Sequence, residues 1–127
     1  MTELRVKGIR GAISVPANTK EAILSAAKEL TAQIMAANSL DKGDIISIIY
    51  TVTPDLNAEF PAKGARELGL TDVALMCAQE IPVPGALPRC LRVLIHAHGD
   101  DQPPKHIYLG QARQLRPDWG NDNVAGD

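Results

Sequence analysis

Arg92 lies in the middle of a run that is otherwise typical of a buried strand, Arg89-Cys90-Leu91-Arg92-Val93-Leu94-Ile95-His96-Ala97. Arginine is almost never buried without a partner, because removing a permanent charge from water is costly. Glu80 follows another apolar run, Val73-Ala74-Leu75-Met76-Cys77, and is the obvious partner within the chain. Two strands would then bring an acid and a base to one wall, where the base could also bind an anionic substrate. The alternative is that Arg92 lies on the open face of an edge strand and contacts only water.

The chain holds further arginines, Arg10, Arg66 and Arg116, together with Tyr108, but it has no serine-centred motif of the hydrolase type. Guanidinium groups are well suited to carboxylates, which they bind through paired hydrogen bonds. We therefore expect a small polyanionic metabolite as the ligand, and a reaction that needs only orientation and charge stabilisation.

His96 and His98 would lie on one side of a strand, with Asp100 and Asp101 close behind them. Such a group could serve a divalent metal, although the spacing fixes no third ligand. A metal-dependent hydrolase is therefore one alternative, and an exposed strand end that runs into a polar turn is the more common explanation.

Cys77 and Cys90 do not form a CxxC motif, and each lies in an apolar run where cysteine usually behaves as a small hydrophobic residue. We expect no disulfide between them.

The elements that must position these residues follow from hydrophobic periodicity. A strand is predicted over residues 4–13 and a long amphipathic helix over 20–37, with Asn18 as its N-cap. Residues 45–52 are rich in β-branched side chains and predict a central strand. A short helix is expected within 60–69, with Pro61 at its first position.

Two more strands flank the turn at residues 82–85, and order resumes at 106–109, whereas residues 111–115 fit either a strand or a helical turn. We predict one mixed α/β domain over residues 1–127, with a flexible tail from about residue 119. One long helix covers only one face of a four- or five-stranded sheet, so the other face needs a partner, which a homo-oligomer could provide.

Composition narrows the possible partners. The net charge of −2 and the pI near 5.9 offer no broad cationic surface for nucleic acid. The first residues lack the pattern of a signal peptide, and no apolar run approaches the length of a membrane span. We therefore expect a cytoplasmic protein that binds neither nucleic acid nor membrane.

Several short motifs follow one another in a specific order: Gly8-Ile9-Arg10-Gly11-Ala12, Thr53-Pro54-Asp55-Leu56, Phe60-Pro61-Ala62-Lys63, Ala65-Arg66-Glu67-Leu68, Cys77-Ala78-Gln79-Glu80, Cys90-Leu91-Arg92-Val93, His106-Ile107-Tyr108-Leu109 and Leu115-Arg116-Pro117-Asp118. In their combined order and spacing they resemble the monofunctional α/β chorismate mutases, the small trimeric class rather than the all-helical one. The resemblance implies a pseudo-α/β-barrel homotrimer with an active site at each cleft between neighbouring subunits. It also implies the rearrangement of chorismate to prephenate, on the route to phenylalanine and tyrosine, without cofactor, metal or covalent intermediate.

The resemblance also implies roles for residues of this chain. Arg92 would donate to the ether oxygen, which gains negative charge as its bond to the ring breaks; a preorganised donor of this kind is worth about 3–4 kcal/mol. Arg10 and Tyr108 would bind the enolpyruvyl carboxylate and keep the side chain folded over the ring. Glu80 would accept a hydrogen bond from the ring hydroxyl, with Cys77 beside it.

Four further residues would line the site in this resemblance. Phe60 would supply an apolar wall, Arg66 and Arg116 would add positive charge at the mouth for the ring carboxylate, and Leu115 would close one side. The residues themselves leave a second interpretation open, in which a similar trimer with an interfacial arginine is a carboxylate-binding or deaminase-like module.

Overall fold

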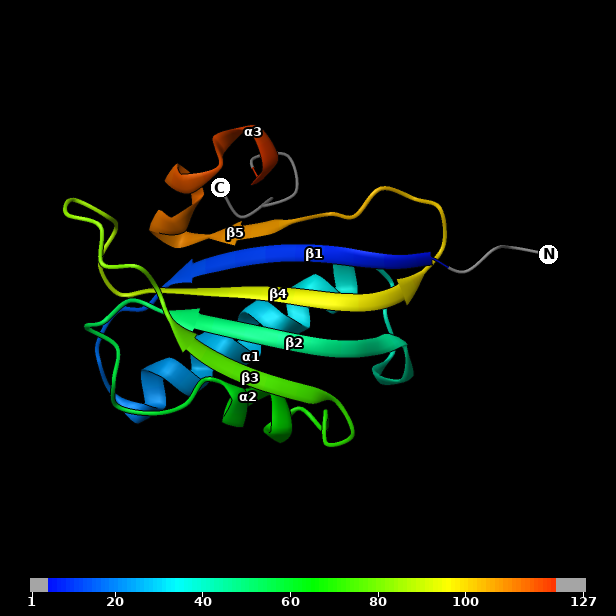
Figure 1. The fold of residues 1–127 in the computed structure, drawn as a ribbon, viewed down its shortest axis with the longest axis horizontal. Coiled ribbons are helices and arrows are strands. Elements are labelled where there is room, and N and C mark those ends of the chain that lie inside the picture. The colour runs from blue at the N-terminus through cyan, green and yellow to red at the C-terminus, as the bar shows by residue number, and fades with distance from the viewer. Residues whose placement is uncertain (1–4, 121–127) are drawn as a thin grey trace.

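A single five-stranded mixed sheet organises the computed structural model, which describes residues 5–120 (Figure 1). The strands are β1 (Arg5–Ser14), β2 (Ile45–Val52), β3 (Ala74–Gln79), β4 (Cys90–Gly99) and β5 (Ile107–Leu109). Their order in the sheet is β3-β2-β4-β1-β5. The central strand β4 is antiparallel to both neighbours, while β3 is parallel to β2 and β5 is parallel to β1. The α/β class and the strands predicted from periodicity are confirmed.

Helix α1 (Lys20–Ala37) covers one face of this sheet and lies behind the strands in Figure 1. Its buried side chains include Ile23, Leu30 and Ile34, as the predicted amphipathic face requires. The predicted N-cap was wrong by one residue. Thr19 is extended, and its hydroxyl accepts from the backbone N–H of Ala22, whereas Asn18 accepts instead from the loop after β2.

Helix α2 (Ala62–Glu67) packs against α1, and Pro61 is its N-cap rather than its first helical residue. Gly64, which weakens the helix prediction, lies where the two helices approach most closely. A Cβ atom added at Gly64 would be 3.0 Å from the Cβ atom of Ala27 and 3.2 Å from the carbonyl oxygen of Leu24. The glycine therefore permits close packing at a cost in helix propensity.

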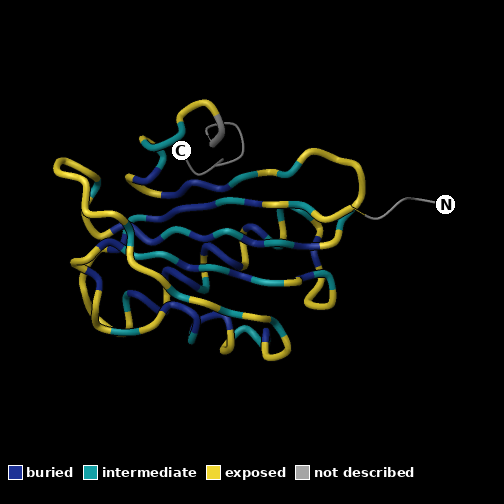
Figure 2. The backbone as a smooth tube through the Cα atoms, viewed as in Figure 1, coloured by how far each residue is buried: buried dark blue, intermediate teal, exposed yellow. Residues whose placement is uncertain are grey.

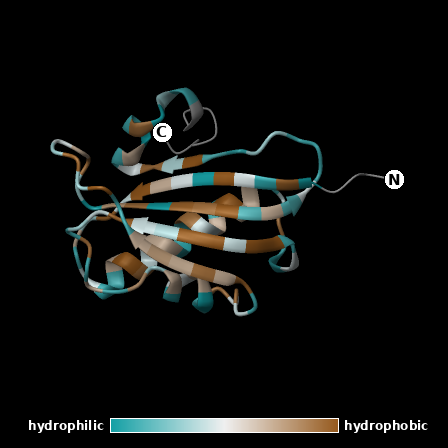
Figure 3. Ribbon diagram, viewed as in Figure 1, coloured by the Kyte–Doolittle hydropathy of each residue, from teal (hydrophilic) through white to brown (hydrophobic). Residues whose placement is uncertain are grey.

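Side chains alternate between the two faces of the sheet, and hydrophobic and hydrophilic residues both occur along β1 and β4 (Figure 3). In β4, Leu91, Val93 and Ile95 are buried in the core with α1, and the intervening Arg92, Leu94 and His96 are only partly buried on the other face (Figure 2). That second face also bears exposed apolar side chains, among which Met76 of β3 is 63% exposed. We call it the open face of the sheet.

Short helical segments complete the described chain. They are η1 (Lys42–Asp44), η2 (Gly110–Leu115) and α3 (Pro117–Gly120). The segment that periodicity left undecided is thus a 3₁₀ helix. Residues 119 and 120, assigned to a flexible tail, belong to α3, because the chain turns once more after Pro117; the rest of the predicted tail, 121–127, lies outside the described residues. Within residues 5–120 no helix has the length and apolar character needed to cross a membrane.

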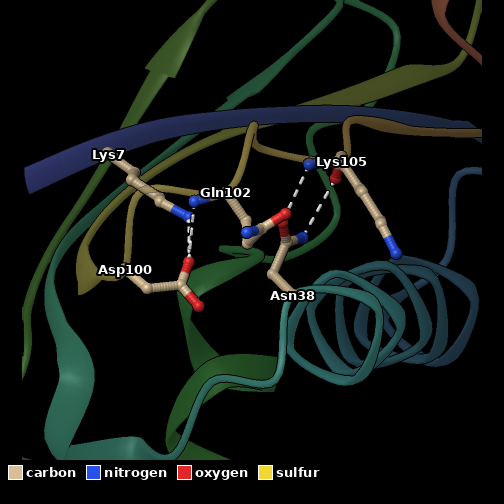
Figure 4. Close-up of polar contacts among 5 residues, drawn as sticks. All are labelled: Lys7, Asn38, Asp100, Gln102 and Lys105. Atoms are coloured by element: carbon tan, nitrogen blue, oxygen red, sulfur yellow. Dashed lines mark hydrogen bonds and ion pairs between the residues drawn. The ribbon is translucent and has the colours of Figure 1, made fainter. Parts of the chain in front are cut away.

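The loop from β4 to β5 is fastened at both ends (Figure 4). Lys7 forms an ion pair of 3.0 Å with Asp100, which also accepts from the backbone N–H of Gln102. Asn38, at the C-terminus of α1, donates to the carbonyl of Lys105 and accepts from its N–H. These contacts fix where β5 begins beside β1.

The core contains one fully buried polar pair, Thr31 of α1 and Tyr50 of β2, whose hydroxyl oxygens are 2.6 Å apart. Burial raises the pKa of Tyr50 to about 12, although the hydrogen bond with Thr31 opposes this. This hydrogen bond joins α1 to β2, the strand that also carries Thr51.

Replacing Thr31 with valine should reduce the free energy of unfolding by about 1–3 kcal/mol, because the buried Tyr50 hydroxyl would lose its partner. Urea unfolding at equal subunit concentration measures the change. The exposed Thr71 offers a control, since Thr71→Val should stay within about 0.5 kcal/mol of the parent protein. Equal stability of the two variants would contradict the role of this hydrogen bond.

Candidate active site

Arg10, Glu80 and Arg92 line one cavity of about 260 Å³ on the open face, together with Thr51. Strand register explains their meeting: Arg92 pairs with Thr51 of β2 on one side and with Ala12 of β1 on the other. Arg10, two residues from Ala12, therefore projects from the same face. Glu80 follows the last residue of β3, and its backbone N–H donates to the carbonyl of Val52 at 2.8 Å.

The predicted contact between Arg92 and Glu80 is present. Arg92 Nε lies 3.5 Å from Glu80 Oε2, and the side chains are 32% and 24% exposed. The same carboxylate accepts a hydrogen bond from the Thr51 hydroxyl, so its orientation is fixed from a neighbouring strand. Arg92 Nε itself is buried and forms no hydrogen bond with the described residues, while the side chain as a whole lines the cavity.

Tyr108 of β5 lies on the other side of β1 from Arg92. Tyr108 pairs with Ala12, so it lies in the same row across the sheet as Arg92, and it packs with Leu115 in a small apolar cluster. Burial raises the pKa of the Tyr108 phenol, and the nearby charges of Arg10, Arg92 and Arg116 oppose that rise. Arg116 is oriented by Asp118, which accepts from its Nε and Nη2 at 3.1 and 2.8 Å.

The remaining predicted residues form a separate group. Cys77 and Phe60 line a different cavity of about 390 Å³, between β3 and the loop before α2. Cys77 pairs with the core residue Tyr50, so it faces the helices and does not line the Glu80 cavity of its own chain. The reason is strand alternation, which directs residues 77 and 80 to opposite faces.

Arg66 belongs with this second group. Burial raises the pKa of the Cys77 thiol, while the backbone N–H of Ala62 and the charge of Arg66 oppose that rise. Phe60 is 67% exposed and Arg66 is exposed, so neither is a core residue. Both cysteines are free.

Two residues that orient the site were not identified from sequence. Thr51 lies in a β-branched run that predicts only a strand, and its contact with Glu80 depends on strand register. His106 is part of a motif but had no assigned role. Its Nδ1 accepts from the backbone N–H of Arg10 at 3.0 Å, just before β5 begins, so the imidazole extends the β1–β5 ladder.

Electrostatically, the first group combines the cations Arg10, Arg92 and Arg116 with two carboxylates, Glu80 and the Asp118 that pairs with Arg116. This excess of positive charge suits a small molecule with more than one carboxylate, and Glu80 can accept from a hydroxyl on that molecule. His96 instead approaches Ser47 Oγ at 3.2 Å. Across residues 5–120 no group of three or more histidine, cysteine, aspartate or glutamate side chains is arranged to bind a metal.

Protonation of His106 should destabilise the protein. Its pKa is lowered by burial and by the charges of Arg10 and Arg116, so the stability gained from the neutral ring is present above the ordinary pKa and is lost as the pH falls through the lowered one. His106→Asn retains an acceptor but does not titrate. Between about pH 7.5 and pH 5, urea unfolding should show a larger loss of stability for the parent than for the variant. Equal losses would contradict this role of His106.

Comparison with known proteins agrees with this architecture. A family model described as chorismate mutase type I matches residues 6–119. The chorismate mutase AroH of Thermus thermophilus is 45% identical over 116 residues, which cover 89% of this chain and 95% of that protein. The chorismate mutase AroH of Bacillus subtilis (strain 168) is 40% identical over 119 residues, covering 91% and 93% of the two chains. A solved structure, the chorismate mutase from Clostridium thermocellum Cth-682, superposes with a TM-score of 0.83 at 46% identity, covering 86% of this chain and 99% of the other.

Proposed function

The chain belongs to the chorismate mutase type I family, and we propose that its active site is assembled from two neighbouring subunits of a homotrimer. It is a chorismate mutase, an isomerase that rearranges chorismate to prephenate. This identity favours the enzyme over the carboxylate-binding module that the residues alone left open. The implied pathway is the synthesis of phenylalanine and tyrosine.

The Arg92 guanidinium is the observation that carries the proposed mechanism. Its side chain lines a cavity together with Arg10, and its Nε lies 3.5 Å from the Glu80 carboxylate. In chorismate the ether bond to the ring breaks and its oxygen gains negative charge, and a fixed cationic donor stabilises that charge more than it stabilises the ground state. Arg92 donates to this oxygen.

Orientation is the second contribution. Arg10 and Tyr108 bind the enolpyruvyl carboxylate and keep the reacting side chain over the ring. This orientation lowers the entropic cost of reaching the transition state. Glu80, already oriented by Thr51, accepts from the ring hydroxyl. Arg116 and Leu115 border the same side of the substrate. No proton is transferred by any of these groups.

A neighbouring subunit supplies the other wall. Phe60, Arg66 and Cys77 lie in or beside a cavity separate from the one that holds Arg92, so a single chain offers two different half-sites. In a cyclic trimer the Arg92 half-site of one subunit meets the Phe60 half-site of the next, which gives three equivalent sites. The exposed apolar side chains of the open face support the same assembly, a pseudo-α/β-barrel, because burial between subunits would remove side chains such as Met76 from water.

Replacing Arg92 with alanine should lower kcat for chorismate by at least about 10²–10³-fold, because the donor for the developing charge is lost. Arg92→Lys should also be poor, since an ammonium group does not reproduce the planar fork. Loss of chorismate is followed by absorbance, and sedimentation checks that each variant keeps the oligomeric state of the parent. Near-normal turnover by either variant would overturn the role of Arg92.

Mixing two impaired variants tests the shared site. Arg92→Ala disables one half-site and the double variant Phe60→Ala/Arg66→Ala weakens the other, so a mixed trimer keeps one intact site. Co-expressed subunits should therefore turn over chorismate faster than the two separate variants combined.

The matched control mixes Arg92→Ala with Glu80→Ala. Both changes affect the same half-site, so no mixed trimer has an intact site and activity should not recover. An additive result for the first mixture, with mixed trimers verified by mass, would show that each site lies within one subunit.

A further inference from the structure

The start of β4 has an unusual backbone. Arg89 has a φ of 45°, in the left-handed region that side-chain-bearing residues disfavour, and it directly precedes Cys90, the first residue of the strand. Among residues 5–120 only Ser39, after α1, shares this property without being glycine. Strained backbone of this kind persists where the surroundings determine it strongly.

Hydrogen bonds to Asp55 stabilise this conformation of Arg89. The backbone N–H of Arg89 donates to both carboxylate oxygens of Asp55, at 3.1 and 2.9 Å, and the Thr53 hydroxyl donates to the same carboxylate at 2.5 Å. Partial burial would raise the pKa of Asp55, but the hydrogen bonds from Thr53 and Arg89 outweigh it and lower the pKa. The ionised form is therefore the one that these donors favour.

The neighbouring backbone groups are fixed as well. Thr53 Oγ1 accepts from the N–H of Cys90 at 3.0 Å, and the N–H of Thr53 donates to the carbonyl of Cys90 at 3.1 Å. The carbonyl of Arg89 accepts from the N–H of Val15 at 2.8 Å, while Arg89 Nε donates to the carbonyl of Val15 at 3.1 Å. All four backbone polar groups of residues 89 and 90 are thus tied to the segments that follow β1 and β2.

Arg92 is two residues further along β4 and shares the face of Cys90. We propose that Asp55 is a positioning residue for catalysis: it fixes the left-handed turn at Arg89 and thereby sets the direction of the Arg92 guanidinium relative to Glu80. Glu80 is oriented by Thr51 and Val52, the last two residues of β2. Residues 53–55 directly follow that strand, so one continuous segment contacts both Glu80 and the backbone that precedes Arg92. This inference rests on the role proposed for Arg92.

Asp55→Ala should lower kcat for chorismate by roughly 10- to 100-fold, with a smaller change in KM, because a displaced donor loses charge stabilisation in the transition state more than substrate binding. The measurement is made on folded protein, well below the unfolding midpoint. Asp72→Ala removes another exposed aspartate that forms no described hydrogen bond, and it should leave kcat unchanged.

A second substitution in the Asp55→Ala variant distinguishes a positioning role of Asp55 from a general loss of stability. Glycine adopts positive φ without steric cost, so Arg89→Gly in the Asp55→Ala background should recover most of the lost kcat. Ser39→Gly places glycine at the other left-handed position and should not recover it, even where it stabilises the protein. Wild-type kcat in folded Asp55→Ala, or no recovery with Arg89→Gly, would overturn the proposal. Near-normal turnover by Arg92→Ala would instead refute the function assigned to Arg92 itself.

Discussion

Arg92 projects from the centre of β4 into a cavity where its Nε lies 3.5 Å from the Glu80 carboxylate. A guanidinium in a sheet is tolerated only if its charge is compensated, and Glu80 compensates it without saturating its donors. In the proposed mechanism the same guanidinium also donates to the ether oxygen of the substrate. The register of the neighbouring strands maintains this arrangement. Thr51 orients Glu80, and every backbone N–H and carbonyl of residues 89 and 90, which precede Arg92 in the chain, forms a hydrogen bond.

The same sheet supports the proposal that each active site is shared between two subunits. Alternation along β3 directs Cys77 toward the helices, whereas Glu80 lines a cavity on the open face, so the predicted site residues of one chain line two separate cavities. Assembly would complete each site and at the same time cover the apolar open face. Catalysis and burial of apolar surface therefore favour the same oligomer.

Much of this could be predicted from sequence, because hydrophobic periodicity and ordered motifs determine the strands, the long helix and the family. Arg92 and Glu80 were both identified, since a charge in an apolar strand and an acid after a neighbouring one are visible in the sequence. The face that Cys77 occupies could not be predicted, because a motif does not show which face of a strand each residue occupies. Thr51 and Asp55 were missed as orienting groups, because their contacts join residues 29 and 34 positions apart in the chain and depend on register.

We propose that Arg92 stabilises the breaking ether more than it binds the carboxylates of the substrate. Calorimetric titration of the parent and Arg92→Ala proteins with a bicyclic dicarboxylate ether that mimics the transition state, and with prephenate, tests it directly. The substitution should weaken binding of the mimic at least about tenfold more than binding of prephenate, which lacks that ether. Equal weakening of both ligands would show that Arg92 contributes only uniform binding and would contradict the account.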